Sequence, residues 1–111
     1  MTTLKKDTKN DLVLVELDRP RFLRFGHKSL KKLTLITGWD LDKMEDNTFG
    51  LDDLEKVMWC GLQADAVENN EELKFEDMED LLDKASSYGD LLEAMNEALA
   101  KAFQKTDKEK N

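Results

Sequence analysis

The chain has 111 residues, and its 25 acidic and 17 basic side chains give a formal net charge of −8 with the one histidine neutral. This length fits one domain with one hydrophobic core. A single cysteine excludes a disulfide scaffold and favours a reducing compartment, and we find neither a signal peptide nor an apolar stretch long enough for a bilayer. We therefore expect a soluble cytosolic protein that does not bind a membrane.

The charge is divided unevenly along the chain. Residues 19–39 carry six Lys or Arg and no acid, whereas residues 40–98 carry 19 acids and four bases, a net −15. Solvated helix faces that neutralise each other within one fold are the simple explanation. The alternative is a polar subunit that associates head to tail as a homo-oligomer, which closes into a ring or continues as a spiral.

The N-terminal region predicts a β-hairpin. Residues 1–10 are polar, and we expect them to be disordered. Residues 11–18 are short and rich in Val and Leu, which predicts a strand that is apolar on both faces. A turn at 18–21 leads to a second short strand at 21–25. Because a lone two-stranded hairpin is marginal in water, it must pack on the helices or extend a sheet in a neighbouring subunit.

The remainder is helical in pattern, so the predicted fold class is mainly α. We expect a single, small four-helix domain with a short N-terminal β-hairpin over residues 11–104, followed by a frayed tail at 105–111. Apolar spacing predicts the first three helices at about 27–37, 51–64 and 75–84, with an acidic loop at 40–49.

Several residues predict the details of the helix ends and contacts. Gly38 is expected to end the first helix in the left-handed conformation. Ser87 and Asp90 have the spacing of a capping box before a last helix, whose apolar stripe runs from Leu91 to Phe103. Gly61 is a weak helix former near the end of the second helix, where such a residue usually marks the close approach of another backbone.

Familiar catalytic and metal-binding patterns are missing from the sequence. His27 has no partners at the spacing of a zinc site or a catalytic triad. Cys60 lies on an apolar helix and is expected to be buried and inert. In a calcium-binding loop starting at Asp40, Met44 and Glu45 would replace an oxygen ligand and the required glycine. We expect a protein that is not an enzyme and uses no metal or cofactor.

A protein partner is the better expectation for the remaining features. Basic and aromatic residues alternate at 19–25, as nucleic-acid binding would favour, but the acidic run that follows would repel phosphate, so we expect no nucleic acid. Met58, Met78 and Met95 lie in helical stripes that favour the core. An apolar face could grip a partner helix while cations set its orientation, which makes these the candidate partner-binding residues: Trp59, Leu62, Arg21, Arg24, Lys28, Lys31 and Lys32.

Three stretches of the chain resemble the tail assembly chaperones of siphophages and related prophages. The first is the basic and apolar segment at 21–33, continuing to a glycine at position 38. The second joins Leu51–Glu55 to the aromatic-x-Gly-Leu pattern at Trp59–Leu62. The third is Leu73–Leu82, in which Lys74 replaces the threonine that the family commonly has before its acidic helix. The likeness covers about residues 12–103.

The resemblance implies a non-enzymatic, mainly helical protein that acts in the host bacterial cytoplasm. It would coat the tape measure protein, keep that apolar helical partner soluble, help to recruit the tail tube protein, and be absent from the mature virion. Two other classes stay open. One is a structural virion component such as a tail tube or connector subunit, and the other is a small acidic regulatory binding protein.

Overall fold

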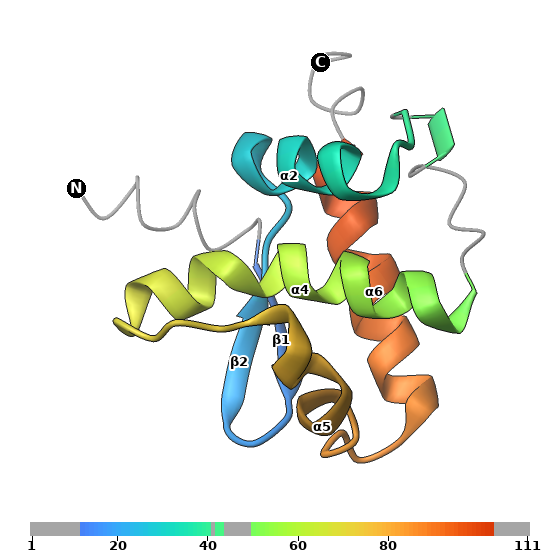
Figure 1. Ribbon diagram of the computed structural model, residues 1–111. Coiled ribbons are helices and arrows are strands. Elements are labelled where there is room, and N and C mark those ends of the chain that lie inside the picture. Colours follow the sequence, from blue (N-terminus) through green and yellow to red (C-terminus); the bar gives the residue numbers. More distant parts are fainter. Residues whose placement is uncertain (1–11, 41, 44–49, 104–111) are drawn as a thin grey trace, which may run out of the picture.

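The computed structural model describes residues 12–40, 42–43 and 50–103 (Figure 1). Within these ranges a β-hairpin precedes four α-helices, which confirms the predicted fold class. The elements in chain order are β1 (Val13–Glu16), β2 (Pro20–Leu23), α2 (His27–Thr37), α4 (Leu51–Glu68), the 3-10 turn η1 (Phe75–Asp77), α5 (Met78–Leu82) and α6 (Tyr88–Phe103). The predictions for residues 1–10 and 105–111, and for most of the loop at 40–49, lie outside the described residues.

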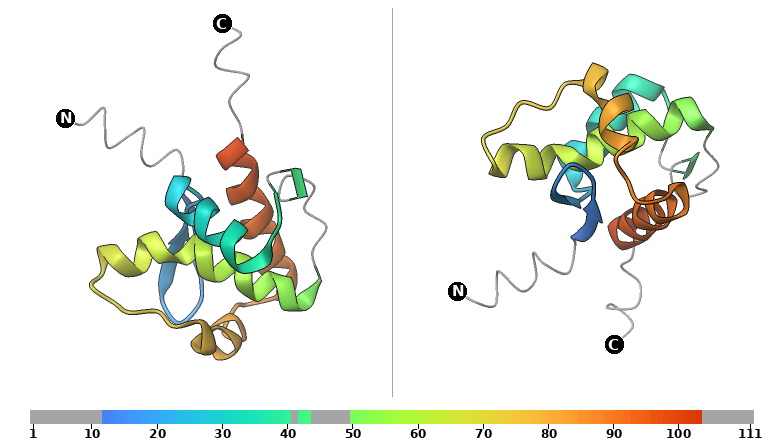
Figure 2. Two further views of the ribbon diagram at one scale, coloured as in Figure 1. Left: turned by 45° about the horizontal axis from the view of Figure 1, so that its top comes forward. Right: turned by 90° about the horizontal axis from the view of Figure 1, so that it is seen from below.

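The central element is α4, which contacts α2, β2, η1, α5 and α6. In Figure 1 it runs across the middle of the molecule, with α2 above it and α5 below it. Seen from below, the hairpin and α6 lie side by side along one flank of α4 (Figure 2, right). All the other described elements except β1 therefore pack directly on this helix, and β1 packs mainly on β2 and α6.

The hairpin buries only one of its two apolar faces. β1 and β2 pair antiparallel, with Val13 opposite Leu23 and Val15 opposite Arg21, and all four of these residues are buried. On the other face Leu14 is 75% exposed. β1 is apolar on both faces, as expected. Because successive side chains of a strand point to opposite faces, the helices cover the face with Val13 and Val15 and leave the face with Leu14 exposed.

The outer edge of β2 is covered by α4. The Arg24 N–H donates to the Gly61 carbonyl at 2.9 Å, and the Phe22 N–H donates to the Asp65 carboxylate at 3.0 Å. Both N–H groups point away from β1, toward the edge at which a third strand would lie in a larger sheet. Here α4 takes the place of that strand and satisfies both groups. The hairpin thus packs on a helix of its own chain. This is one of the two expected ways to stabilise it, the other being the extension of a sheet in a neighbouring subunit.

Two helix ends agree with the sequence patterns. Gly38 ends α2 with φ 80° and donates its N–H to the Thr34 carbonyl at 2.8 Å. At the start of α6, the Asp90 N–H donates to the Ser87 hydroxyl at 3.0 Å, as in a capping box. The Asp90 carboxylate does not complete the box, however, because it accepts a hydrogen bond from the Ser86 hydroxyl.

Two other helices differ from their predicted bounds. α4 extends to Glu68, a full turn beyond the predicted end, and the buried Asp65 in this turn is hydrogen-bonded to the hairpin. The third predicted helix is divided into η1 and α5, and it ends at Leu82. Lys74, at the start of η1, makes no side-chain cap, because a lysine side chain has no hydrogen-bond acceptor.

The core confirms the roles expected of the methionines. Met58, Met78 and Met95 are all buried. In α2, Leu33 is buried but Ile36 is partly exposed, so this helix contributes fewer side chains to the core than its apolar pattern predicts.

Gly61 lies where another backbone segment comes close to α4, as expected, because its carbonyl accepts the Arg24 N–H at 2.9 Å. A Cβ atom at this position would lie 2.6 Å from Cζ of Phe25 and 3.0 Å from Cδ2 of Leu23. Both of these side chains are buried, so neither has space to move. Glycine here lets the segment after β2 lie directly against α4.

We expect Gly61→Ala to destabilise the protein by about 1–3 kcal/mol, because the added methyl overpacks the contact with Phe25. Urea unfolding followed by circular dichroism measures the change. Gly89→Ala is the matched control, because its nearest neighbour would be 3.9 Å away and alanine is the better helix former. Equal stability of Gly61→Ala and the wild type would contradict the close-contact interpretation.

Candidate functional site

Trp59 is half-buried and holds three elements together. Its indole N–H donates to the Leu73 carbonyl at 2.9 Å. Its ring meets the Phe75 ring edge to face at a centroid distance of 5.7 Å, and the Lys32 ammonium lies 4.8 Å from the Trp59 ring centroid. These contacts join α4 to α2 and to the segment that leads into η1, so both the polar group and a ring face of Trp59 already have partners within the chain.

Two of the candidate partner-binding residues are buried. Leu62 is fully buried in the core, so the expected exposed face containing Trp59 and Leu62 is wrong. Arg21 is only 2% exposed, because the alternation of β2 turns position 21 to the same side as Leu23. Sequence spacing places Leu62 on the apolar side of its helix, and the structure shows that this side belongs to the core.

Arg21 belongs to a network of charges that joins the hairpin turn to the end of α4. Its guanidinium donates to Asp18 at 2.8 Å and to Glu71 at 2.8 Å. Arg19 donates to Glu71 and, at 2.7 Å, to the buried Asp65. Because these hydrogen bonds favour the ionised carboxylates, Arg21 lowers the pKa of both Asp18 and Glu71 from their usual values. The network fixes the hairpin turn to the end of α4. Arg19 and Arg21 make their hydrogen bonds within the chain, so they have little part in binding a partner protein.

An apolar groove lies beside this network, between the outer face of the hairpin, the start of α2 and the last turns of α4. Its volume is about 450 Å³. Leu12 and Phe22 form its hairpin side, while Ala64 and Val67 form its α4 side. Val67 is 73% exposed. We call this site the hairpin groove, and its position and apolar lining are typical of a surface that takes apolar side chains of another chain.

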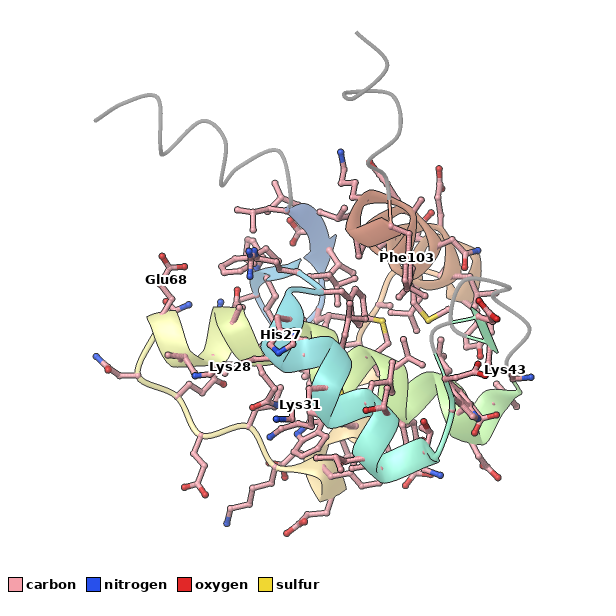
Figure 3. All side chains as sticks on the ribbon, turned by 90° about the horizontal axis from the view of Figure 1, so that it is seen from above. His27, Lys28, Lys31, Lys43, Glu68 and Phe103 are labelled. Carbon is pink, nitrogen blue, oxygen red and sulfur yellow. The ribbon has the colours of Figure 1, made fainter. Side chains whose placement is uncertain are left out.

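Two of the predicted cations lie on the hairpin groove. Arg24 and Lys28 line it together with Glu68, so its margin carries two positive charges and one negative charge. Figure 3 shows Lys28 near the start of α2 and Glu68 at the C-terminal end of α4, with Lys31 one turn further along α2. Lys31 and Lys32 are exposed but do not line the groove.

Sequence reasoning missed the apolar residues of this groove. Phe22 was read only as part of a strand, and Val67 lies beyond the predicted end of its helix. Phe22 did carry a signal, because the alternation of strand residues places it opposite to Arg21 and Leu23. The hydrogen bond between its own N–H and Asp65 brings it to the end of α4.

Comparison with models of known protein families, with curated proteins and with solved structures gave no match. The assignment of a function therefore depends on the residues and the geometry.

The described residues contain no grouping of three or more His, Cys, Asp and Glu side chains that could hold a metal ion. Cys60 is fully buried, and burial raises the pKa of its thiol to about 12. The thiol therefore stays protonated at neutral pH and has little nucleophilic character. In the part of the chain that the structure describes, no helix is long and apolar enough to cross a membrane.

Arg21→Met should lower the free energy of unfolding by about 1–3 kcal/mol, since Asp18 loses its hydrogen bonds to a buried guanidinium and Glu71 keeps only Arg19 as a partner. Urea unfolding at neutral pH measures this loss. Lys28→Met is the matched control, because it removes one exposed positive charge with no ion pair shorter than 4 Å among the described residues. A loss no larger than that of the control would contradict the structural role of Arg21.

The wild type should also lose stability in acid. The native pKa values of Asp18 and Glu71 lie below their ordinary values of 3.8 and 4.5, so the unfolded chain binds more protons in this range. The stability that these carboxylates provide is complete above the ordinary values and is lost as the pH falls through the lowered ones. Urea unfolding at a series of pH values should show this decline, and Arg21→Met should show a shallower one.

Proposed function

We propose that this protein is a tail assembly chaperone of a siphophage or prophage, which binds the tape measure protein through the hairpin groove. The observation that carries the proposal is the groove itself, an apolar channel with a mainly basic margin on a small helical protein. The three sequence stretches that resemble this family support the same function. The site of action would be the cytoplasm of the bacterial host.

The groove suits one face of an amphipathic helix. A helix of this kind presents apolar side chains at positions i, i+3, i+4 and i+7, and these would enter between the hairpin and α4. Arg24 and Lys28 at the margin favour a partner helix whose flanks are acidic. Covering the apolar side of the tape measure protein in this way would keep it from aggregating until tail tube protein subunits take over the same surface.

The residues that carry the interaction differ from the set that the sequence favoured. Phe22 and Val67 take the apolar role that was expected of Leu62, because they are accessible at the groove and Leu62 is not. Arg24 and Lys28 keep their expected role as cations that orient the partner. No chemical step is involved, so the affinity depends on apolar burial and charge alone.

Val67→Glu should weaken binding of the tape measure protein by about tenfold or more, because it places a carboxylate in the apolar lining of the groove. The measurement is co-expression with the tape measure protein of the same gene cluster, followed by quantification of the soluble complex. Ala100→Glu is the matched control, as it adds the same charge to an exposed position near the end of α6 that does not line the groove.

Unchanged recovery of the complex with Val67→Glu would contradict the groove as the binding site. Mass spectrometry of purified phage particles tests the function itself, since a chaperone should be absent from the finished virion. Abundance in the virion would instead support the structural class. Binding to a basic DNA-handling protein, with none to the tape measure protein, would support the acidic regulator.

A further inference from the structure

The backbone groups of β1 face in two directions. On β2, two N–H groups at the outer edge donate to α4, so the groups of Leu23 between them point to β1, where Leu23 lies opposite Val13. The alternation along β1 then turns the N–H and C=O groups of Leu14 and Glu16 to the other side, away from β2. One edge of β1 therefore presents a regular set of backbone donors and acceptors.

This edge of β1 is open in the part of the chain that the structure describes. No hydrogen bond joins the backbone of Leu14 or Glu16 to another described group on this side. Both side chains are exposed. A strand edge of this kind is a template for a further strand, because an extended backbone matches its donors and acceptors and a helix does not.

A cavity of about 200 Å³ lies along the open edge, between β1 and the start of α6. Figure 2 (right) shows the hairpin and α6 side by side in this region. Its apolar lining comes from Val15 of β1 and from Ala85, Leu91 and Ala94. Because side chains alternate along a strand, a further strand would direct the side chain opposite Val15 into this space. We call this site the edge cavity.

The margin of the edge cavity is acidic. Glu16 and Asp90 line it, and none of the described residues of its lining is a Lys or Arg. Neither carboxylate forms an ion pair shorter than 4 Å among the described residues. Oppositely charged side chains stabilise each other when they lie directly opposite on paired strands. A basic side chain opposite Glu16 is therefore favoured.

We propose that the open edge of β1 binds an extended segment of a partner protein, which adds to the hairpin as a third, antiparallel strand. The site defines the order of three residues in that segment, a basic residue opposite Glu16, an aliphatic residue opposite Val15 and a β-branched residue opposite Leu14. The edge cavity and the hairpin groove share no lining residue. One molecule can therefore bind an extended segment and a helix at the same time.

A second copy of the chain does not suit the open edge. β2 has the order basic, apolar, apolar at residues 21–23, but Arg21 and Leu23 are buried and the outer edge of β2 is covered by α4. Pairing two β1 edges would bring together Glu16 and Asp90 from both copies, and like charges on neighbouring strands are destabilising. The occupant is a different protein with a basic and apolar extended segment.

Amide hydrogen exchange followed by NMR tests the open edge in the full chain. Without a partner, the amides of Leu14 and Glu16 should exchange at least about tenfold faster than those of Val13 and Val15, which face β2. The probe is a capped peptide of sequence Gly-Thr-Lys-Val-Ile-Thr-Gly, which has the proposed order of residues. At saturation it should slow the exchange of the Leu14 and Glu16 amides by about tenfold or more.

A proline variant tests the role of the backbone. Leu14→Pro removes an N–H group on the open edge and none that faces β2, so peptide binding should weaken by at least about tenfold. Leu14→Ala is the matched control, because it shortens the same side chain and keeps the N–H group. It should retain most of the affinity, and circular dichroism checks that both variants fold.

A charge reversal gives a second test that does not depend on the proline variant. Glu16→Lys should bind the peptide about threefold or more weakly than the wild type does. It should bind more tightly than the wild type to a peptide in which glutamate replaces the lysine. Glu16 is exposed, so this exchange of preference reports on the strand pair and not on stability.

Several results would overturn the proposal. They are no binding of the peptide to the wild type, equal binding by Leu14→Pro and Leu14→Ala, and an unchanged preference in Glu16→Lys. Slow exchange of the Leu14 and Glu16 amides before peptide is added would also contradict it, with a second copy as the occupant if protection rises with protein concentration and the same chain if it does not. Val67→Glu should bind the peptide like the wild type, and a loss there would place the peptide in the hairpin groove instead.

Discussion

The contact between the outer edge of β2 and α4 is the interaction on which the rest of the structure depends. A two-stranded hairpin leaves polar backbone groups unpaired at its edges, and the carbonyl of Gly61 and the carboxylate of Asp65 satisfy two of them. Only a helix that presents a glycine can come this close, because a Cβ atom would meet the Phe25 ring. The hairpin, in turn, covers the side of α4 that contains Gly61 and forms one side of the hairpin groove.

The uneven charge of the chain serves two purposes that the residue counts alone do not separate. Part of it is used inside the subunit, where Arg19 and Arg21 pair with Asp18, Asp65 and Glu71 to fasten the hairpin turn to α4. The attraction within such pairs mostly offsets the free energy that it costs to remove the charges from water, so the pairs add little net stability. They do fix the position of the hairpin turn relative to α4. The rest of the positive charge of residues 19–39 lies mainly on α2, and much of the negative charge surrounds α5 and the ends of its neighbours.

The hairpin groove is the apolar surface that the fold leaves open beside the last turns of α4. Its lining is mainly apolar, and its margin carries the charges of Arg24, Lys28 and Glu68. A surface of this kind is selective because a partner with the wrong charge is repelled before apolar contact forms.

The sequence by itself determined the mainly α fold, the N-terminal hairpin, the end of α2 at Gly38, the cap of α6 at Ser87 and the burial of the core methionines. These features depend on local backbone preference and on apolar periodicity, which neighbouring residues express directly. Only the tertiary structure decided that Arg21 and Leu62 are buried and that Phe22 and Val67 line a groove. The reason is that either face of a strand or helix can be covered, and the choice depends on which distant segment docks there. For this chain the choice was made by Gly61 and Asp65, which hydrogen-bond to hairpin residues 37 and 43 positions away in the sequence.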